Sequence, residues 1–132
     1  MSAVFLDTQD IANPMNGAEI ADGTAVARLF KALRGRKPFF FKLQGRNGYT
    51  LLVGVGGPLT CAQYSRSDGE GAAVVAVAPH PARSVGEVEF LTGNTLTPVP
   101  GEYCMPESVV RSIVRYFVET GKRSADVAWE TV

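Results

Sequence analysis

The side chains best suited to chemistry in this sequence are its single histidine and its two cysteines. His80 lies between Pro79 and Pro81, and a Ser-His-Asp or Cys-His arrangement would have to use it. The flanking prolines predict an exposed, stiff corner, whereas a general base needs neighbours that orient its ring. Cys61 and Cys104 are far apart in the chain, and the carboxylates follow no metal-ligand spacing. We therefore predict that the protein is not an enzyme and has no catalytic residue, metal site or cofactor.

A glycine-rich segment, Gly54-Val55-Gly56-Gly57, has the composition of a loop that cradles phosphate groups. Such loops lead into the N-terminus of a helix and often carry Lys and Ser or Thr. Here Pro58 and then another apolar run follow. The glycines are therefore predicted to form a turn or bulge at the end of a strand.

Seven basic residues and no acidic residue occur between positions 28 and 46. With three phenylalanines beside them, they suit single-stranded nucleic acid, whose binding combines charge with stacking rings. The same residues also suit a solvated helix followed by a core strand. A nucleic-acid-associated module is therefore the alternative function, and its residues would be Arg28, Lys31, Arg34, Arg36, Lys37, Lys42 and Arg46, beside Phe39, Phe40 and Phe41.

A group of carboxylates suggests a protein partner instead. Glu87 and Glu89 alternate with apolar residues, which predicts a strand with one wet face. Asp68 and Glu70 lie in a polar loop shortly before it. Such carboxylates form either an ordinary solvated surface or an acidic surface that attracts a basic partner and speeds association. The candidate partner-binding residues are Tyr64, Arg66, Asp68, Glu70, Glu87 and Glu89.

The composition is that of an ordinary soluble protein, with 132 residues, 45% of them hydrophobic and 20% charged. This length predicts a single domain over residues 1–132. The 13 basic and 13 acidic residues give a formal net charge of zero, whereas a dedicated nucleic-acid binder usually carries a basic excess. The N-terminus has no basic region, and no apolar run is long enough to cross a bilayer. We expect a cytoplasmic protein without membrane contact, and with both cysteines reduced.

Apolar periodicity and turn residues predict the order of the secondary structure. The segment Asp10–Gly23 is predicted to be a loop, and Thr24 to cap a helix that Gly35 and Pro38 end. Asn47-Gly48 between two apolar runs is a strong hairpin signal. The predicted strands are Val4–Leu6, Phe39–Leu43, Tyr49–Val55, Leu59–Tyr64, Ala72–Val77 and the segment that contains Glu87–Phe90.

The last quarter of the sequence is predicted to form a helix and a closing strand. Pro106 suits the first helical position, because its φ is already helical and its missing N–H would have no partner there. Gly121 is placed to adopt the left-handed conformation that ends a helix. Val127 and Trp129 then alternate with their neighbours, which indicates a short strand with a buried Trp. The apolar stripe of the helix consists of Val109, Val110, Ile113, Val114 and Phe117.

These elements follow the order strand, helix, meander of strands, helix and strand. Consecutive strands joined by short turns pair antiparallel, and two helices then cover one face of the sheet. The sequence therefore predicts an α+β fold. We expect a two-layer sandwich with a mainly antiparallel meander sheet of about five to seven strands.

Three motifs occur in a fixed order between residues 51 and 130. Leu51–Gly57 is an apolar strand with a glycine turn, Gly86–Phe90 is a later strand, and Phe117–Arg123 is a helix stop followed by Trp129-Glu130. Together they cover roughly residues 39–132 and resemble immunity family one of bacterial polymorphic toxin systems. The motif residues that this resemblance identifies are Gly54, Gly56, Gly57, Phe117, Gly121, Trp129 and Glu130.

The resemblance implies a function in toxin immunity. Immunity proteins of this family bind a cognate toxin of the same bacterium and block it, and the partner is often a nucleic-acid deaminase. The resemblance therefore implies a monomer, or a heterodimer with a deaminase-type toxin, and no direct contact with nucleic acid. Such a toxin exposes a cationic cleft, which an acidic surface would plug in competition with substrate phosphates. One departure is Ser124, which stands where the family usually has Pro after the helix-stop Arg.

Overall fold

The computed structural model describes residues 1–78 and 86–132, so His80 and its flanking prolines lie outside the described residues. Two α-helices are described, α1 (Gly23–Ala32) and α2 (Glu107–Thr120), and a 3-10 turn spans Gly101–Tyr103. The described strands are β1 (Ala3–Asp7), β2 (Glu19–Ile20), β3 (Phe39–Gly45), β4 (Tyr49–Val55), β5 (Leu59–Arg66), β6 (Val74–Val77), β7 (Glu87–Thr92), β8 (Thr95–Pro100), β9 (Met105–Pro106) and β10 (Ala128–Thr131).

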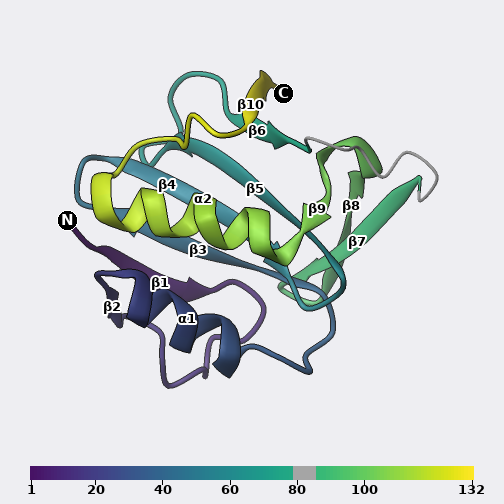
Figure 1. Ribbon diagram of the computed structural model, residues 1–132. Helices are drawn as coiled ribbons and strands as arrows, with labels where there is room; N and C mark the ends of the chain where they lie inside the picture. Colours follow the sequence, from purple (N-terminus) through teal and green to yellow (C-terminus); the bar gives the residue numbers. More distant parts are fainter. Residues whose placement is uncertain (79–85) are drawn as a thin grey trace.

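The sheet confirms the predicted meander. Its main path runs β10-β6-β5-β4-β3-β1-β2, and every neighbouring pair along this path is antiparallel. Both helices lie on one face of this sheet, with α2 along β3 to β5 and α1 beside β1 (Figure 1). The predicted two-layer α+β fold is therefore confirmed.

The main difference from the prediction is a hairpin at one end of the sheet. β7 pairs with β8 over its whole length but with β3 at a single parallel position, Phe39 with Leu91. The sheet is thereby larger than the five to seven strands predicted. β8 was not predicted as a strand because it contains Pro98 and Pro100, which a strand tolerates only at a sheet edge. β2 and β9, of two residues each, are too short to give a periodic signal.

The helix boundaries differ from the prediction by one or two residues. Asp22, and not Thr24, caps α1, because its carboxylate accepts a hydrogen bond from the N–H of Ala25 at 2.9 Å. Pro106 precedes α2 as its N-cap and does not occupy the first helical position. Gly121 ends α2 with a φ of 75°, in the predicted left-handed conformation.

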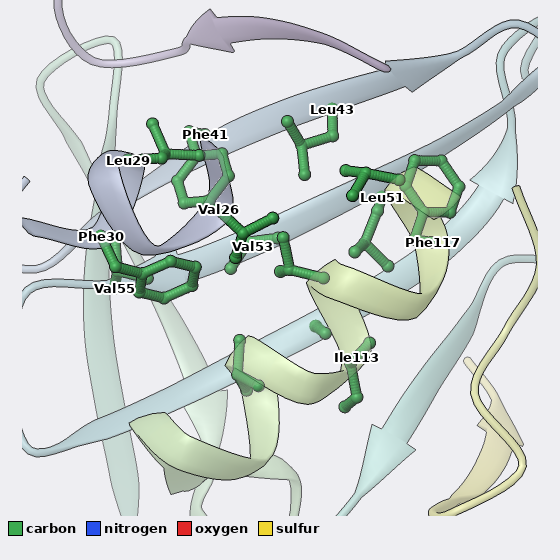
Figure 2. Packing of buried hydrophobic residues seen from close by; sticks show 14 of the residues in the cluster. Val26, Leu29, Phe30, Phe41, Leu43, Leu51, Val53, Val55, Ile113 and Phe117 are labelled. Carbon is green, nitrogen blue, oxygen red and sulfur yellow. The ribbon is translucent and has the colours of Figure 1, made fainter. Parts of the chain in front are cut away.

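The main hydrophobic core lies between the helices and the sheet (Figure 2). Phe41 of β3 is fully buried, with its ring centroid 5.3 Å from that of Phe5 and 6.3 Å from that of Phe30 on α1. α2 contributes Ile113 and Phe117 to the same core. Burying each such side chain stabilises the fold by roughly 1.5–3 kcal/mol. The three phenylalanines of β3 are thus core residues and not a stacking platform for bases.

A second, smaller core lies on the opposite face of the sheet, where the β7–β8 hairpin packs. It consists of Phe40, Cys61, Phe90 and Cys104, and the rings of Phe40 and Phe90 are 5.1 Å apart. Both cysteines are buried and free, as predicted. Burial raises the pKa of both thiols, that of Cys104 to about 11, which keeps them protonated and unreactive.

Gly54 separates the sheet from the ring of Phe90, so a side chain there is expected to push the hairpin away. A Cβ on Gly54 would lie 2.7 Å from the sulfur of Cys61 and 2.8 Å from the ring of Phe90. We expect Gly54→Ala to lower the free energy of unfolding by about 2 kcal/mol, measured by urea denaturation. Gly57→Ala is the matched control, because its Cβ would approach only Pro38, at 3.6 Å. Equal losses in the two variants would contradict this packing explanation.

Candidate functional site

The structure places the predicted partner-binding residues of the β5 end in a tight turn. Tyr64 is half-buried on the helix-covered face, where it stacks on Tyr49 at 4.8 Å and its hydroxyl donates to the carbonyl of Gly121. Arg66 pairs with Asp68 at 2.6 Å. The backbone N–H of Glu70 and the guanidinium of Arg66 hold the pKa of Asp68 below its usual range. Tyr64 thus packs the fold, whereas Arg66, Asp68 and Glu70 form an exposed turn.

Glu87 and Glu89 lie at the opposite end of the sheet. Arg66 pairs with Tyr49 at the start of β4, whereas β7 joins the sheet at Phe39, which pairs with Val55 at the end of β4. The length of β4 therefore separates the two groups of carboxylates by about 20 Å. In Figure 1 the turn after β5 and the strand β7 stand at opposite ends of the sheet. Both glutamates are exposed, as the alternating pattern predicted, but they do not join Asp68 and Glu70 in one patch.

The motif residues at the C-terminal end face both sides of the sheet. Trp129 packs against the main core, and its indole N–H donates to the carbonyl of Ser124 at 2.9 Å. Glu130, its neighbour in β10, faces the opposite side, where its hydrogen bond with Tyr103 raises the pKa of that hydroxyl. Trp129 is half-buried, and its neighbour Glu130 faces the other side because side chains alternate along a strand.

The seven basic residues of the stretch 28–46 do not share one face. Arg36 is held by the carboxylate of Asp7 and lies 3.6 Å over the ring of Phe39. Arg46 pairs with Glu19, and Lys42 lies on the helix-free face of the sheet. Arg28 and Lys31 are exposed on α1, on the opposite side. This arrangement gives a single strand of nucleic acid no continuous path over the stretch.

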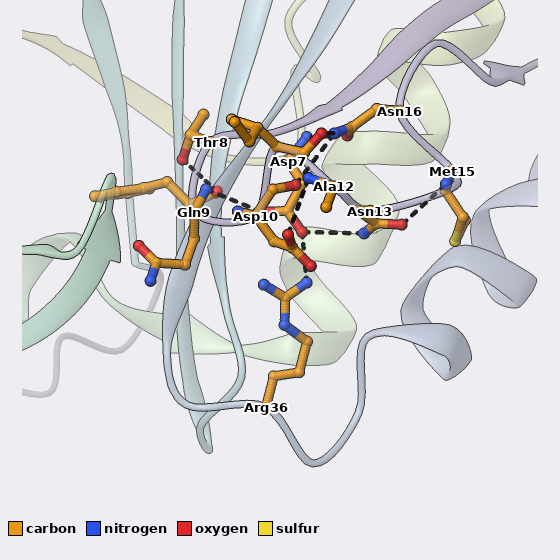
Figure 3. Close-up of polar contacts among 11 residues, drawn as sticks. Asp7, Thr8, Gln9, Asp10, Ala12, Asn13, Met15, Asn16 and Arg36 are labelled. Atoms are coloured by element: carbon orange, nitrogen blue, oxygen red, sulfur yellow. Dashed lines mark hydrogen bonds and ion pairs between the residues drawn. The ribbon is translucent and has the colours of Figure 1, made fainter.

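A buried carboxylate that the sequence prediction missed organises the loop after β1 (Figure 3). Asp7 accepts hydrogen bonds from Arg36 at 2.6 Å, from the amide of Asn13 at 3.0 Å and from the backbone N–H groups of Gln9 and Asp10. Burial raises the pKa of Asp7, but these four hydrogen bonds outweigh it, and the pKa lies below its usual value. The only sequence signal is an Asp that directly follows an apolar strand.

The same loop holds the tip of the β7–β8 hairpin. The hydroxyl of Thr8 donates to the carbonyl of Phe40, and the carbonyl of Thr8 accepts from the N–H of Gly93. The side chain of Gln9 exchanges two hydrogen bonds with Asn94, each 2.7 Å long. The Asp7 network therefore fixes where the hairpin stands over the sheet.

Within residues 1–78 and 86–132, no three side chains of His, Cys, Asp and Glu gather as metal ligands. Within the same ranges, neither helix has the length and apolar content to cross a bilayer. The described residues instead present three exposed polar surfaces. These are the acidic end of the β7–β8 hairpin, the Arg66–Asp68–Glu70 turn and the helix layer, which carries basic side chains.

The comparison with protein families identifies the chain. The family model described as immunity protein Imm1 matches residues 18–131, which include α1, α2 and the strands β2 to β10. No curated protein and no solved structure matches the chain. The matched range contains all three motifs that carry the resemblance found in the sequence. The chain therefore belongs to the immunity protein Imm1 family, the immunity proteins of toxin systems.

Proposed function

We propose that this protein binds and blocks a cognate bacterial toxin whose activity is nucleic-acid deamination. The observation that carries the proposal is the family match over residues 18–131, because an immunity protein implies a toxin partner. We propose further that the chain acts as a single domain, in the cytoplasm, and forms a one-to-one complex with the toxin. Inhibition then comes from binding alone, without a cofactor and without a reaction at this protein.

The deaminase part of the proposal rests on charge. A deaminase that acts on nucleic acid must admit a polyanion to a zinc-activated water, so its cleft carries cationic residues. Carboxylates that enter this cleft would compete with substrate phosphates and steer the association. The candidate toxin contacts are the exposed Glu87 and Glu89 at one end of the sheet, and Arg66, Asp68 and Glu70 beside Tyr64 at the other. About 20 Å separates the two groups, so they are two distinct candidate contacts.

The test is co-expression with the toxin domain encoded next to this gene. We expect cells to survive and the two proteins to co-purify as a stable complex, and we expect deamination of a nucleic-acid substrate by the purified toxin to stop when this protein is added. Growth arrest despite soluble expression, with no complex recovered, would refute the immunity proposal for that toxin. If the cells survive but the toxin shows no deamination, the immunity function is supported and the proposal that the toxin is a deaminase is refuted.

A further inference from the structure

The face of the sheet opposite the helices carries a straight row of side chains in register. Lys42 on β3 lies opposite Leu52 on β4, and Leu52 lies opposite Gln63 on β5. Gln63 lies opposite Val75 on β6, which in turn lies opposite Glu130 on β10. Leu52 and Val75 thus place apolar surface in the middle of this face, between a cation at one side and a carboxylate at the other.

The β7–β8 hairpin turns this face into a groove, because it covers only the part around Phe40. Between the row and the hairpin lies a groove of about 520 Å³. Leu52, Gln63 and Val75 form its floor, and Val99 and Tyr103 stand in its wall. We call this space the open-face groove. Its lining combines apolar side chains such as Leu52, Val75 and Val99 with polar ones such as Gln63 and Tyr103, as in sites that bind a partner.

The side of the groove formed by the 3-10 turn and β10 is acidic. Glu130 lies opposite Val75, and Glu130 and Glu102 raise the pKa of the Tyr103 hydroxyl between them. Both glutamates are exposed, and neither pairs with a described Lys or Arg. Glu87 and Glu89 alternate with Val88 and Phe90, which pack on the second core, so their side chains face away from the groove.

The helix layer carries exposed or half-exposed charges of both signs. Arg28 and Lys31 lie on α1, and α2 carries Arg111 and Arg115 together with Glu107 and Glu119. The groove differs, because its Tyr103 side carries Glu102 and Glu130, and Lys42 lies at its far side. A partner segment that contacts the Tyr103 side meets carboxylates, so charge complementarity calls for a cationic segment there.

The edge of the hairpin excludes one mode of docking. Pro98 and Pro100 of β8 have no N–H group, so this edge lacks donors that an added strand needs. A partner must therefore bind through side chains placed in the groove. Tyr103 is suited to anchor such a contact, because a half-buried Tyr offers both an aromatic face and a hydroxyl.

We propose that the open-face groove docks a basic segment of the cognate toxin. An apolar side chain of that segment packs on Leu52 and Val75, and its Arg or Lys side chains meet Glu102 and Glu130. The proposal rests on the proposed function, because a toxin that acts on nucleic acid presents cationic residues around its cleft. Beyond the proposed function, this inference names the surface that binds the toxin and the kind of toxin segment that it binds. It also predicts that the Arg66–Asp68–Glu70 turn lies outside the interface.

The test measures binding of an inactive toxin domain to the full chain by calorimetry and by association kinetics at two salt concentrations. We expect the double variant Glu102→Lys/Glu130→Lys to bind at least about a hundredfold more weakly, with an association rate that no longer falls with salt. Tyr103→Ala is expected to weaken binding about thirtyfold, and Tyr103→Phe less. The matched control is Glu107→Lys/Glu119→Lys, which makes the same charge change on exposed or half-exposed residues of α2, away from the groove, and should bind within about threefold of the original.

The outcomes separate this inference from the proposed function. Failure of the unaltered protein to bind the toxin refutes both. Binding by the unaltered protein that the groove variants leave intact, at unchanged melting temperature, refutes the groove alone. Loss of binding in the control variant instead would assign the contact to the helix face. A free protein that is a dimer in light scattering, and becomes a monomer on Tyr103→Ala, would show that a second copy occupies the groove and would overturn the proposal.

Discussion

Replacing Asp7 with alanine is expected to lower the free energy of unfolding by about 3 kcal/mol. The substitution leaves Arg36 without its carboxylate and removes the acceptor of Asn13 and of two backbone N–H groups. The side chain of Asp7 is fully buried, but that of Arg36 is 29% exposed. Water therefore reaches the orphaned guanidinium, which places the loss at the lower end of the range for broken buried pairs. Urea denaturation followed by circular dichroism measures it.

Asp10→Ala is the matched control for this variant. Asp10 is exposed, and its carboxylate accepts one hydrogen bond, from the N–H of Ala12. We expect this substitution to cost about 0.5 kcal/mol. If Asp7→Ala and Asp10→Ala lose the same free energy, the buried network does not stabilise the fold as inferred.

The Asp7 variant also predicts a dependence on pH. Because the folded pKa of Asp7 lies below its usual value, its contribution is complete above the unfolded pKa of about 3.9. The contribution disappears as the pH falls through the lower folded pKa. The difference in stability between the unaltered protein and Asp7→Ala should therefore be constant from pH 7 to pH 5 and shrink below about pH 4. A difference that grows toward acid pH would contradict the assignment.

Replacing Gly121 with alanine is expected to cost about 2–3 kcal/mol. The φ of 75° at this position costs an L-residue roughly 1–2 kcal/mol. A Cβ there would also lie 2.6 Å from the side-chain nitrogen of Asn47, whose hydrogen bond to the Gly121 carbonyl is 2.7 Å long. Asn47 must then move, and the link between the end of α2 and the β3–β4 turn is lost. Thermal and urea denaturation measure the change.

Gly48→Ala separates the two costs. Gly48 has a φ of 84°, and a Cβ there would have no neighbour within 4 Å. It should therefore lose only the conformational part, about 1 kcal/mol. A loss at Gly48 as large as the loss at Gly121 would mean that the contact with Asn47 contributes nothing.

Much of the fold was predictable because its signals are local. The aromatic run of β3, the Asn47-Gly48 turn and the apolar stripe of α2 each specify their own element within a few residues. Gly121 was predictable for the same reason, since a helix stop is read from its neighbours. The meander was predictable because short turns bring consecutive strands side by side, where they pair antiparallel.

The surface was less predictable because it depends on distances through the fold. Asp68 and Glu87 are close in sequence, yet the length of β4 separates them. Asp7 and Arg36 are far apart in sequence and meet only after α1 has packed. Glu130 entered the sequence prediction as a motif residue, and only the pairing with Val75 shows that it borders a groove. Charge sign was readable from the sequence, but the geometry of the charged surface was not.

The order of the strands also bears on how the protein reaches its folded state during synthesis. β3 to β6 leave the ribosome one after another and pair with their sequence neighbours, which favours rapid formation of this meander. The apolar face of the meander, however, is covered by α2, which is translated only after the hairpin and β9. A nascent chain that ends before α2 therefore exposes Leu51 and Val53 to solvent, and such an apolar surface attracts chaperones and other unfolded chains. Protection against a toxin then begins only once α2 has been made, which sets a minimum delay between translation of this chain and the first inhibited toxin molecule.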